Sequence, residues 1–218
     1  MRILIVTSVQ AERDAIGETE GVTIVVGGVG RTNAAAATTE TVIRHGPFDL
    51  VINAGIAGAL PGSDLAIGDA VLASKCVYFE EGLNGPDGFA DMAAMGFPLG
   101  DFDGNVVPVN ESLLRRVSSA MPPTPRTLIG PIATVATCSG TNEAAAAVVG
   151  RTGAIAEAME GAAVVHAARR LKLPALEIRS ISNFTGDRAG QRWDLKSALR
   201  SLAAVMRSVS GALQARTA

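Results

Sequence analysis

Three charged side chains lie in apolar surroundings and are the first candidates for chemistry. Glu12 follows an apolar N-terminal segment, Glu160 interrupts an Ala- and Val-rich stretch, and Arg179 ends an apolar run. A carboxylate at the edge of a sheet can act as a general base, and a buried charge needs a partner or a ligand. Ribose hydroxyls can donate to Glu160. The structural alternatives are a capping or surface role for Glu12 and a water-facing acid on an amphipathic helix, which fits Glu157 better than Glu160.

Two glycine-rich segments follow apolar runs. Residues 27–30 follow the run at 22–26, and residues 53–60 follow the run at 50–52. Glycines let backbone approach a ligand closely, although a tight turn is the alternative. Asn33 stands where the dinucleotide fingerprint needs a third small residue, which disfavours a nicotinamide site. Two such loops at the carboxyl edge of a parallel sheet predict a small-molecule crevice.

Short β-branched runs alternate with Ala-rich stretches along the chain. This pattern predicts an α/β fold with a mostly parallel sheet, and residues 1–218 are expected to form a single domain. The expected strands are 3–6, 22–26, 50–52, 70–72, 128–135 and 175–181. The expected helices are 32–45, 142–150, 157–171 and 194–215.

Residues 80–105 break this rhythm. The segment is rich in Gly, Asp and Pro and is too long for a simple turn. Loops of this length are often lids or binding loops, and the alternative is a disordered surface insertion. The interleaved Phe89, Met92, Met95 and Phe97 argue against disorder.

Composition excludes several classes of protein. The chain is 48% hydrophobic with a net charge of −2 and 4% aromatic residues, which argues against disorder and against a nucleic-acid binder. It has no apolar run of about 18 residues and no signal-like N-terminus, so we expect a cytoplasmic protein without membrane contact. Cys76 and Cys138 are expected to be reduced, buried thiols, and no metal site or cofactor is indicated. His45 and His166 are interpreted as structural.

Several motifs occur together in a recognisable order. Each is weak alone, and they are Val29-Gly30, Asn53–Leu60, Gly68–Val71, Ala158–Ala163 and Arg179–Asn183. In this order the chain resembles the purine nucleoside phosphorylase and nucleosidase superfamily, and within it the futalosine hydrolases most closely. The narrower resemblance is carried by Glu81–Phe89, Gly96–Pro98, Gly186–Arg188 and Trp193-Asp194.

The resemblance implies a fold, an activity and an assembly. The fold would be a three-layer α/β/α sandwich around a mixed, mostly parallel sheet. The activity would be N-glycosidic hydrolysis of futalosine to hypoxanthine and dehypoxanthine futalosine, in menaquinone biosynthesis. The protein would need no cofactor and would form a homo-oligomer, a dimer or larger.

The resemblance also implies roles for individual residues. Glu12 would activate the hydrolytic water, Arg179 would help to hold it, and Asn183 would recognise the purine. The substrate-binding residues would be Met159 and Glu160 at the ribose, Ala57 and Gly58 at the floor, Thr137 and Cys138 beside the base, and Phe89 and Phe97 against the benzoate end of the substrate.

Two departures from the superfamily pattern bear on the substrate. Adenine-specific relatives have Asp where Asn183 stands, and an amide that both donates and accepts suits a 6-oxopurine. The phosphate-binding pattern of the phosphorylases is absent from residues 8–13, which favours water as the nucleophile, although Arg13 and Arg31 keep phosphate open. The alternatives are a methylthioadenosine/S-adenosylhomocysteine nucleosidase, a 6-oxopurine nucleoside phosphorylase and an inert nucleoside-binding protein.

Overall fold

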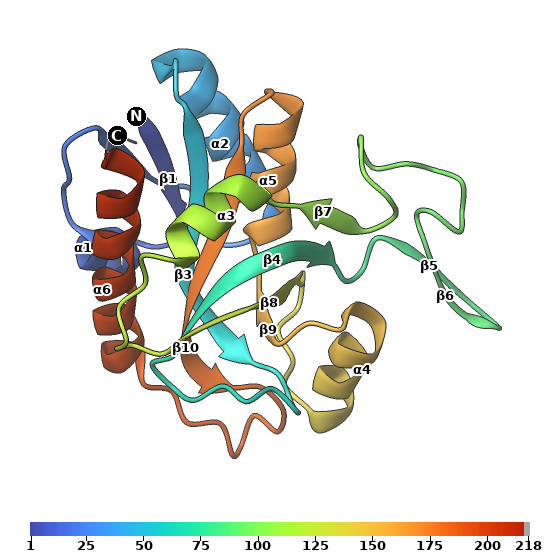
Figure 1. Cartoon of the computed structure of the whole chain (residues 1–218). Helices are drawn as coiled ribbons and strands as arrows, with labels where there is room; N and C mark the ends of the chain where they lie inside the picture. The colour runs from blue at the N-terminus through green and yellow to red at the C-terminus, as the bar shows by residue number, and fades with distance from the viewer. Residues whose placement is uncertain (216–218) are drawn as a thin grey trace.

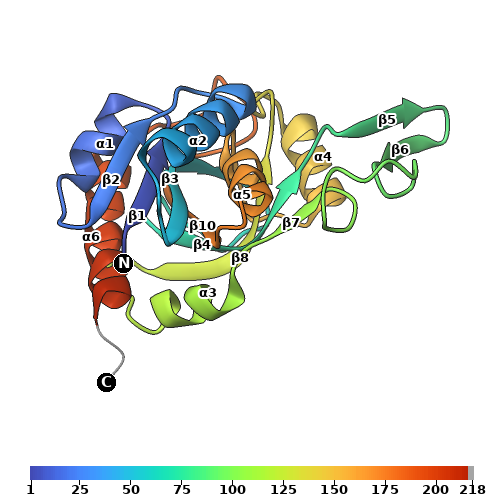
Figure 2. The ribbon, with the colours of Figure 1, turned by 90° about the horizontal axis from the view of Figure 1, so that it is seen from above.

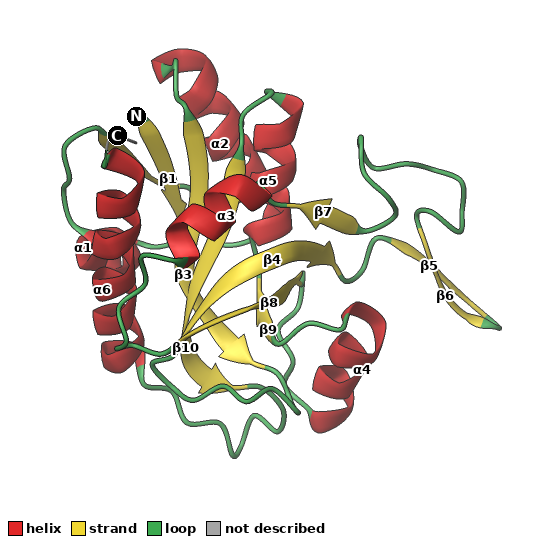
Figure 3. Cartoon of the chain, viewed as in Figure 1, coloured by secondary structure: helices red, strands yellow, loops and turns green. Residues whose placement is uncertain are grey.

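Apolar runs of the sequence form the centre of an eight-stranded mixed sheet in the computed structural model, which describes residues 1–215 (Figures 1 and 3). The pairs β1–β2, β1–β3, β3–β10, β4–β8 and β8–β9 are parallel, and the other pairs are antiparallel. The mixed, mostly parallel sheet is therefore as predicted. The strands are β1 (Ile3–Thr7), β2 (Val22–Val26), β3 (Leu50–Ala59), β4 (Ala70–Tyr78), β7 (Val106–Pro108), β8 (Thr127–Thr134), β9 (Ala156–Ala158) and β10 (Ala175–Phe184).

Part of the sheet closes on itself. Strand β3 pairs with β10 and β9, β10 pairs with β4, and β8 joins β4 to β9. These five strands form a ring, and its two longest strands, β3 and β10, run side by side. The prediction of a glycine-rich loop at residues 53–60 is wrong, because strand β3 continues to Ala59. Strands β10 and β9 pair with β3 along this stretch, and its residues are buried except for the half-buried Ile56. Buried polar groups, Glu12 and Arg179, lie against Gly55.

Helices cover both faces of the sheet in two packed groups (Figure 2). Helix α2 packs on α5, whereas α1 and α3 pack on α6. Leu202, Met206, Val209 and Leu213 of α6 are buried at helical spacing, which explains why this helix was predictable. The helices are α1 (Gln10–Ile16), α2 (Arg31–His45), α3 (Glu111–Ser118), α4 (Asn142–Thr152), α5 (Gly161–Arg170) and α6 (Leu195–Gln214).

The predicted helix at residues 157–171 begins later than expected. Residues Ala156–Ala158 form strand β9, and α5 starts only at Gly161. Backbone pairing with β3 on one side and β8 on the other holds Ala156 and Glu157 extended. This long-range pairing overrides the helical pattern of the sequence. The sequence did not predict helices α1 and α3, strands β7 and β9, or the short strands β5 (Gly82–Gly85) and β6 (Gly88–Asp91).

The unusual segment at residues 80–105 contains an ordered hairpin. Strands β5 (Gly82–Gly85) and β6 (Gly88–Asp91) pair antiparallel and project from the body of the molecule (Figures 1 and 2). The guanidinium of Arg151 in α4 lies 4.2 Å from the ring centroid of Phe79 and 3.7 Å from that of Phe89. This stacking ties the hairpin to α4. The alternative of a disordered insertion is therefore wrong.

The helices of residues 1–215 include none that is both long enough and apolar enough to cross a membrane.

Candidate active site

Glu12 lies in the first turn of α1, directly after β1, and its side chain is buried. Its Oε2 accepts hydrogen bonds from the backbone N–H groups of Ser8 (2.8 Å) and Val9 (3.2 Å). Its Oε1 accepts from the N–H of Ile56 in β3 (3.0 Å). The carboxylate is therefore held in one orientation where the carboxyl end of β1 meets β3. A fixed carboxylate at this edge is suited to act as a general base.

Arg179 of β10 is a fully buried guanidinium surrounded by acceptors. Its Nε donates to Glu177 Oε1 (2.9 Å), and its Nη2 donates to Glu160 Oε2 (3.3 Å) and to the side-chain oxygen of Asn53. Burial lowers the pKa of Arg179, but Glu177 and Glu160 outweigh burial, and the net shift is upward. Arg179 is therefore a permanent cation that orders the carboxylates around it.

Gly55 explains how Glu12 and Arg179 come together. A Cβ atom at Gly55 would overlap Glu12 Oε1 and would lie 2.7 Å from Arg179 Nη1. Only a residue without a side chain allows both groups to cross this point of β3. Gly55 lies in a strand and not in the predicted loop, and its missing side chain leaves space for the charged groups of Glu12 and Arg179.

Glu160 connects the glycine-rich segment at residues 27–30 to Arg179. The residue precedes α5 and is buried, with 4% of its surface exposed. Its Oε1 accepts from the N–H of Gly30 (3.0 Å), while its Oε2 pairs with Arg179. A carboxylate fixed at both oxygens is suited to accept from a pair of adjacent hydroxyls, the arrangement that ribose presents.

Glu177 is a further carboxylate that pairs with Arg179, and sequence analysis missed it. It is fully buried, and its Oε2 has no hydrogen-bond partner among the described residues. Burial raises the pKa of Glu177, although Arg179 and the Cys76 thiol oppose the shift. The available signal was its position two residues before Arg179 in an apolar strand, because alternate residues share one face.

A cavity of about 370 Å³ contains the predicted purine-recognising residue. Asn183 is buried, and its Oδ1 accepts from Ser182 Oγ (2.9 Å) while its Nδ2 donates to the carbonyl of Phe184 (3.2 Å). The volume is within the range of small-molecule sites. The cavity is lined by Gly58, Cys138, Ser139, Gly140, Glu157, Asn183, Arg188, Gln191 and Trp193.

Glu157 faces this cavity and not the solvent, so its predicted water-facing position is wrong. Only 4% of its surface is exposed. Its Oε1 accepts from the N–H of Ser139 (2.8 Å) and its Oε2 from Ser139 Oγ (2.6 Å). Burial raises the pKa of Glu157, and the contacts with Ser139 only partly offset the shift. The helical pattern misplaced this residue because its backbone lies in β9, opposite Gly58 of β3.

The remaining predicted binding residues are divided between the cavity and other places. Ala57 is buried and its carbonyl accepts from Ser182 Oγ (3.2 Å), and Met159 is half-buried against the cluster around Leu60 and Val135. Thr137 is exposed and is not a lining residue of the cavity. Cys138 lines the cavity and is exposed, so the expectation of two buried thiols holds for Cys76 alone.

The structure does not bring Phe89 and Phe97 to this cavity. Phe89 lies in β6 under Arg151, and Phe97 is 63% exposed. Both belong to the projecting segment and not to the lining of the cavity within one chain. Their contact with the substrate stays a prediction.

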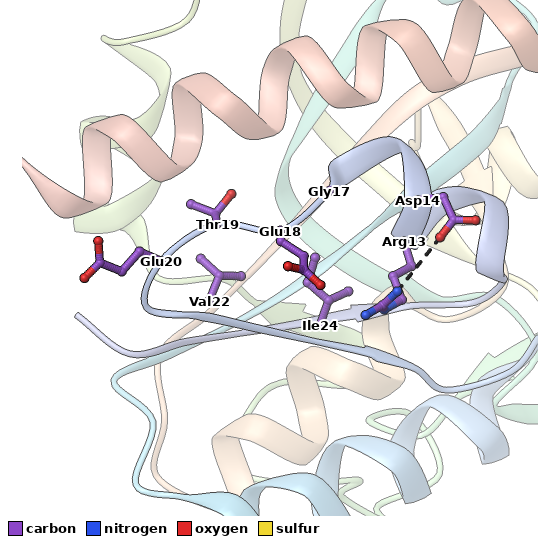
Figure 4. A pocket seen from close by; sticks show the side chains of 8 residues that line it. All are labelled: Arg13, Asp14, Gly17, Glu18, Thr19, Glu20, Val22 and Ile24. Carbon is purple, nitrogen blue, oxygen red and sulfur yellow. Dashed lines mark ion pairs between the residues drawn. The ribbon is translucent and has the colours of Figure 1, made fainter.

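Arg13 and Arg31, the two candidate residues for binding phosphate, lie close to carboxylates. Arg31 Nη1 pairs with Glu81 (2.6 Å) and Glu80 (3.3 Å). Arg13 lies 3.9 Å from Asp14 and lines a separate hollow beside α1 and β2, together with Glu18 (Figure 4). A phosphate site needs a cation free to bind oxygen, and neither guanidinium is presented to the cavity of Asn183.

The chain is similar to proteins of known activity. The model of the family described as "Phosphorylase superfamily" matches residues 11–215. A futalosine hydrolase of Streptomyces coelicolor is 31% identical, over 93% of this chain and 92% of that protein. A futalosine hydrolase of Acidothermus cellulolyticus is 35% identical, over 91% and 86%.

A solved structure shows the same fold. The 5'-methylthioadenosine/S-adenosylhomocysteine nucleosidase of Colwellia psychrerythraea, in complex with adenine, superimposes with a TM-score of 0.80 at 23% identity. The similarity covers 98% of this chain and 96% of that chain. From the family match and the two relatives above 30% identity, the chain belongs to the phosphorylase superfamily and, within it, to the family of the futalosine hydrolases.

Proposed function

We propose that the protein is a futalosine hydrolase, which breaks the N-glycosidic bond of futalosine and releases hypoxanthine. The observation that carries the proposal is the placement of a fixed, buried Glu12 beside the Arg179–Glu160 pair, in a chain with an amide at position 183. Relatives named as futalosine hydrolases align over nearly the whole chain. The substrate is thus a small nucleoside.

The proposed reaction uses Glu12 as the general base. Its carboxylate takes a proton from a water molecule, whose oxygen bonds to the anomeric carbon of the sugar. The bond from that carbon to N9 of the purine breaks, and its electron pair leaves with the base, which takes up a proton from solvent to give neutral hypoxanthine. Positive charge develops on the sugar ring in this step, and nearby carboxylates stabilise that charge.

Glu160 and Asn183 bind the two halves of the substrate in this proposal. Glu160 accepts hydrogen bonds from the ribose hydroxyls, and Asn183 donates to the purine. Because Arg179 is already surrounded by Glu160, Glu177 and Asn53, we assign it to positioning Glu160 and not to direct contact with water. This differs from the role that the resemblance implied.

Hydrolysis is favoured over phosphorolysis by the arginines. Arg31 is paired with two carboxylates, and Arg13 lines a different hollow. A methylthioadenosine/S-adenosylhomocysteine nucleosidase is the second candidate, because such an enzyme shares the fold with a TM-score of 0.80. Asn183 disfavours it, since an amide donates hydrogen bonds but is not an acid that could protonate the leaving adenine.

The substrate panel that tests the proposal contains futalosine, inosine and methylthioadenosine. Each is incubated with purified protein, and the released base is identified by chromatography. We expect hypoxanthine from futalosine and little release from the other two. Adenine from methylthioadenosine as the main product would instead establish the second candidate, and binding without any turnover would indicate an inert nucleoside-binding protein.

A further inference from the structure

Asn183 by itself does not select one kind of purine. A 6-oxopurine presents an acceptor at O6 and a donor at N1–H, whereas a 6-aminopurine presents a donor at N6 and an acceptor at N1. The Asn183 amide is oriented by Phe184 and Ser182, and its second N–H can donate to N7, which is an acceptor in both kinds of purine. Selection of hypoxanthine therefore needs a second group whose hydrogen-bonding polarity is fixed.

Glu157 is a group of this kind in the same cavity. An ionised carboxylate only accepts hydrogen bonds, and its two oxygens offer about four lone-pair sites. Ser139 uses one site on each oxygen, through its N–H (2.8 Å) and its Oγ (2.6 Å). The carboxylate thus retains acceptor capacity while its position is fixed. Its backbone is fixed as well, because β9 pairs with β3 and β8.

We propose that Glu157 determines base specificity by accepting a hydrogen bond from N1–H of a 6-oxopurine bound beside Asn183. The inference builds on the proposed futalosine hydrolysis and names the residue that reads the base. With a 6-aminopurine, the lone pair of N1 would face the carboxylate oxygens. The buried carboxylate would then lose its partner and repel the base, which is how a polar site rejects a close analogue.

A purely structural role for Glu157 makes a different prediction. Its two bonds to Ser139 hold the segment of residues 138–140 against β9. If this were its whole role, substitution would lower stability and activity with every base alike. The ratio of activities between two bases separates the two roles, because a general loss cancels in the ratio.

The decisive experiment compares futalosine with its 6-amino analogue, in which an amino group replaces O6. The two substrates differ only at the base. For the wild type we expect kcat/KM to favour futalosine strongly. In Glu157→Gln, the amide can donate to N1 of the amino analogue, and we expect this preference to fall about 10- to 100-fold. The matched control is Glu111→Gln, an exposed glutamate of α3, which should keep the wild-type ratio.

The outcomes separate this inference from the proposed function. An unchanged ratio in a folded Glu157→Gln protein would overturn the inference and leave futalosine hydrolysis intact. If the wild type turns over neither substrate, the proposed function fails, and calorimetry with free hypoxanthine and adenine still measures base preference in wild type and variant.

A further measurement needs no variant. In 1-methylhypoxanthine a methyl group replaces the N1 hydrogen that Glu157 is proposed to bind. Calorimetry on the wild type should show at least about tenfold weaker binding of this base than of hypoxanthine. Equal affinity for the two bases would overturn the inference even if Glu157→Gln does not fold.

Discussion

At the scale of single residues, the site concentrates negative charge around one cation. Glu160 and Glu177 both pair with Arg179, and Glu12 lies next to it across Gly55. Buried carboxylates in excess of cations are costly in a resting protein. The same excess favours a reaction in which positive charge develops on the substrate, because the sugar cation then supplies the missing charge. The cluster is therefore suited to N-glycosidic cleavage.

Glu12→Gln tests the general base. The amide keeps the size of the side chain but has no basic oxygen to take the proton of water. We expect kcat for futalosine to fall by about 10²-fold or more, with a smaller change in KM. Glu18→Gln, an exposed position shortly after α1, is the matched control in steady-state kinetics. A kcat close to that of the wild type would remove Glu12 from the proposed mechanism.

Glu157 also gives a prediction on pH. Burial raises the pKa of Glu157 above its ordinary value of 4.5, so the folded protein binds this proton more tightly than the unfolded chain does. Glu157 therefore contributes its full stabilisation below pH 4.5, and this stabilisation is lost as the pH rises through the raised pKa. In urea titrations at increasing pH across this window, the wild type should lose stability relative to Glu157→Gln. A difference between the two proteins that is independent of pH would contradict the shift.

At the scale of elements, strand β3 carries the site because its side chains are small. Five of the residues 53–59 are Gly or Ala, and their small size leaves space for Glu12, Arg179 and the cavity of Asn183. A Cβ at Gly58 would lie 2.7 Å from Thr185 and 3.3 Å from Asn183 Nδ2. The strand therefore depends on its glycines for contacts and not for turns.

Gly55→Ala tests this dependence. The added methyl group would overlap the Glu12 carboxylate, so we expect a loss of about 1–3 kcal/mol in the free energy of unfolding, with loss of activity. Gly150→Ala is the control, because a Cβ there meets nothing within 4 Å and lies in helix α4. The Gly150→Ala change should increase the free energy of unfolding by about 0.5–1 kcal/mol. Equal effects of the two substitutions in urea unfolding would show that the close contacts at Gly55 do not require a glycine.

The hairpin of β5 and β6 is stacked against one side chain of α4. Arg151 stacks on Phe79 and Phe89 and donates to the carbonyl of Phe79 (2.9 Å). We expect Arg151→Ala to speed hydrogen–deuterium exchange at residues 82–91 and to leave β3 and β10 protected. Arg44→Ala, which removes an exposed pair with Glu40, should leave exchange in the hairpin unchanged. Unaltered exchange in Arg151→Ala would show that other contacts hold the hairpin.

The sequence predicted elements wherever local pattern and tertiary packing agree. Strand β2 and helix α6 are close to their predicted bounds, because the β-branched run of β2 favours extended backbone and the 3–4 spacing of apolar residues in α6 matches its burial. The pattern failed at Glu157 and at residues 53–60, where pairing between distant strands decides the conformation. Glu177 was missed because burial of a charge next to Arg179 depends on the pairing of β10 and not on spacing alone.

At the scale of the whole molecule, the projecting hairpin bears on assembly. Leu83 on the hairpin is 54% exposed and Phe97 in the same insertion is 63% exposed. The expected homo-oligomer stays a prediction, and these side chains are where we expect a second copy to contact the first. Light scattering coupled to gel filtration should give at least twice the chain mass of 22.3 kDa. A monomeric mass at working concentration would contradict that expectation.

The proposed reaction is the attack of water on the sugar of futalosine. Its most direct test is the mass of the sugar product after incubation of phosphate-free protein with futalosine, with and without added phosphate. We expect free dehypoxanthine futalosine and hypoxanthine, formed at the same rate in both samples. A sugar phosphate as product, or a reaction that requires phosphate, would contradict hydrolysis and assign the chain a phosphorylase activity.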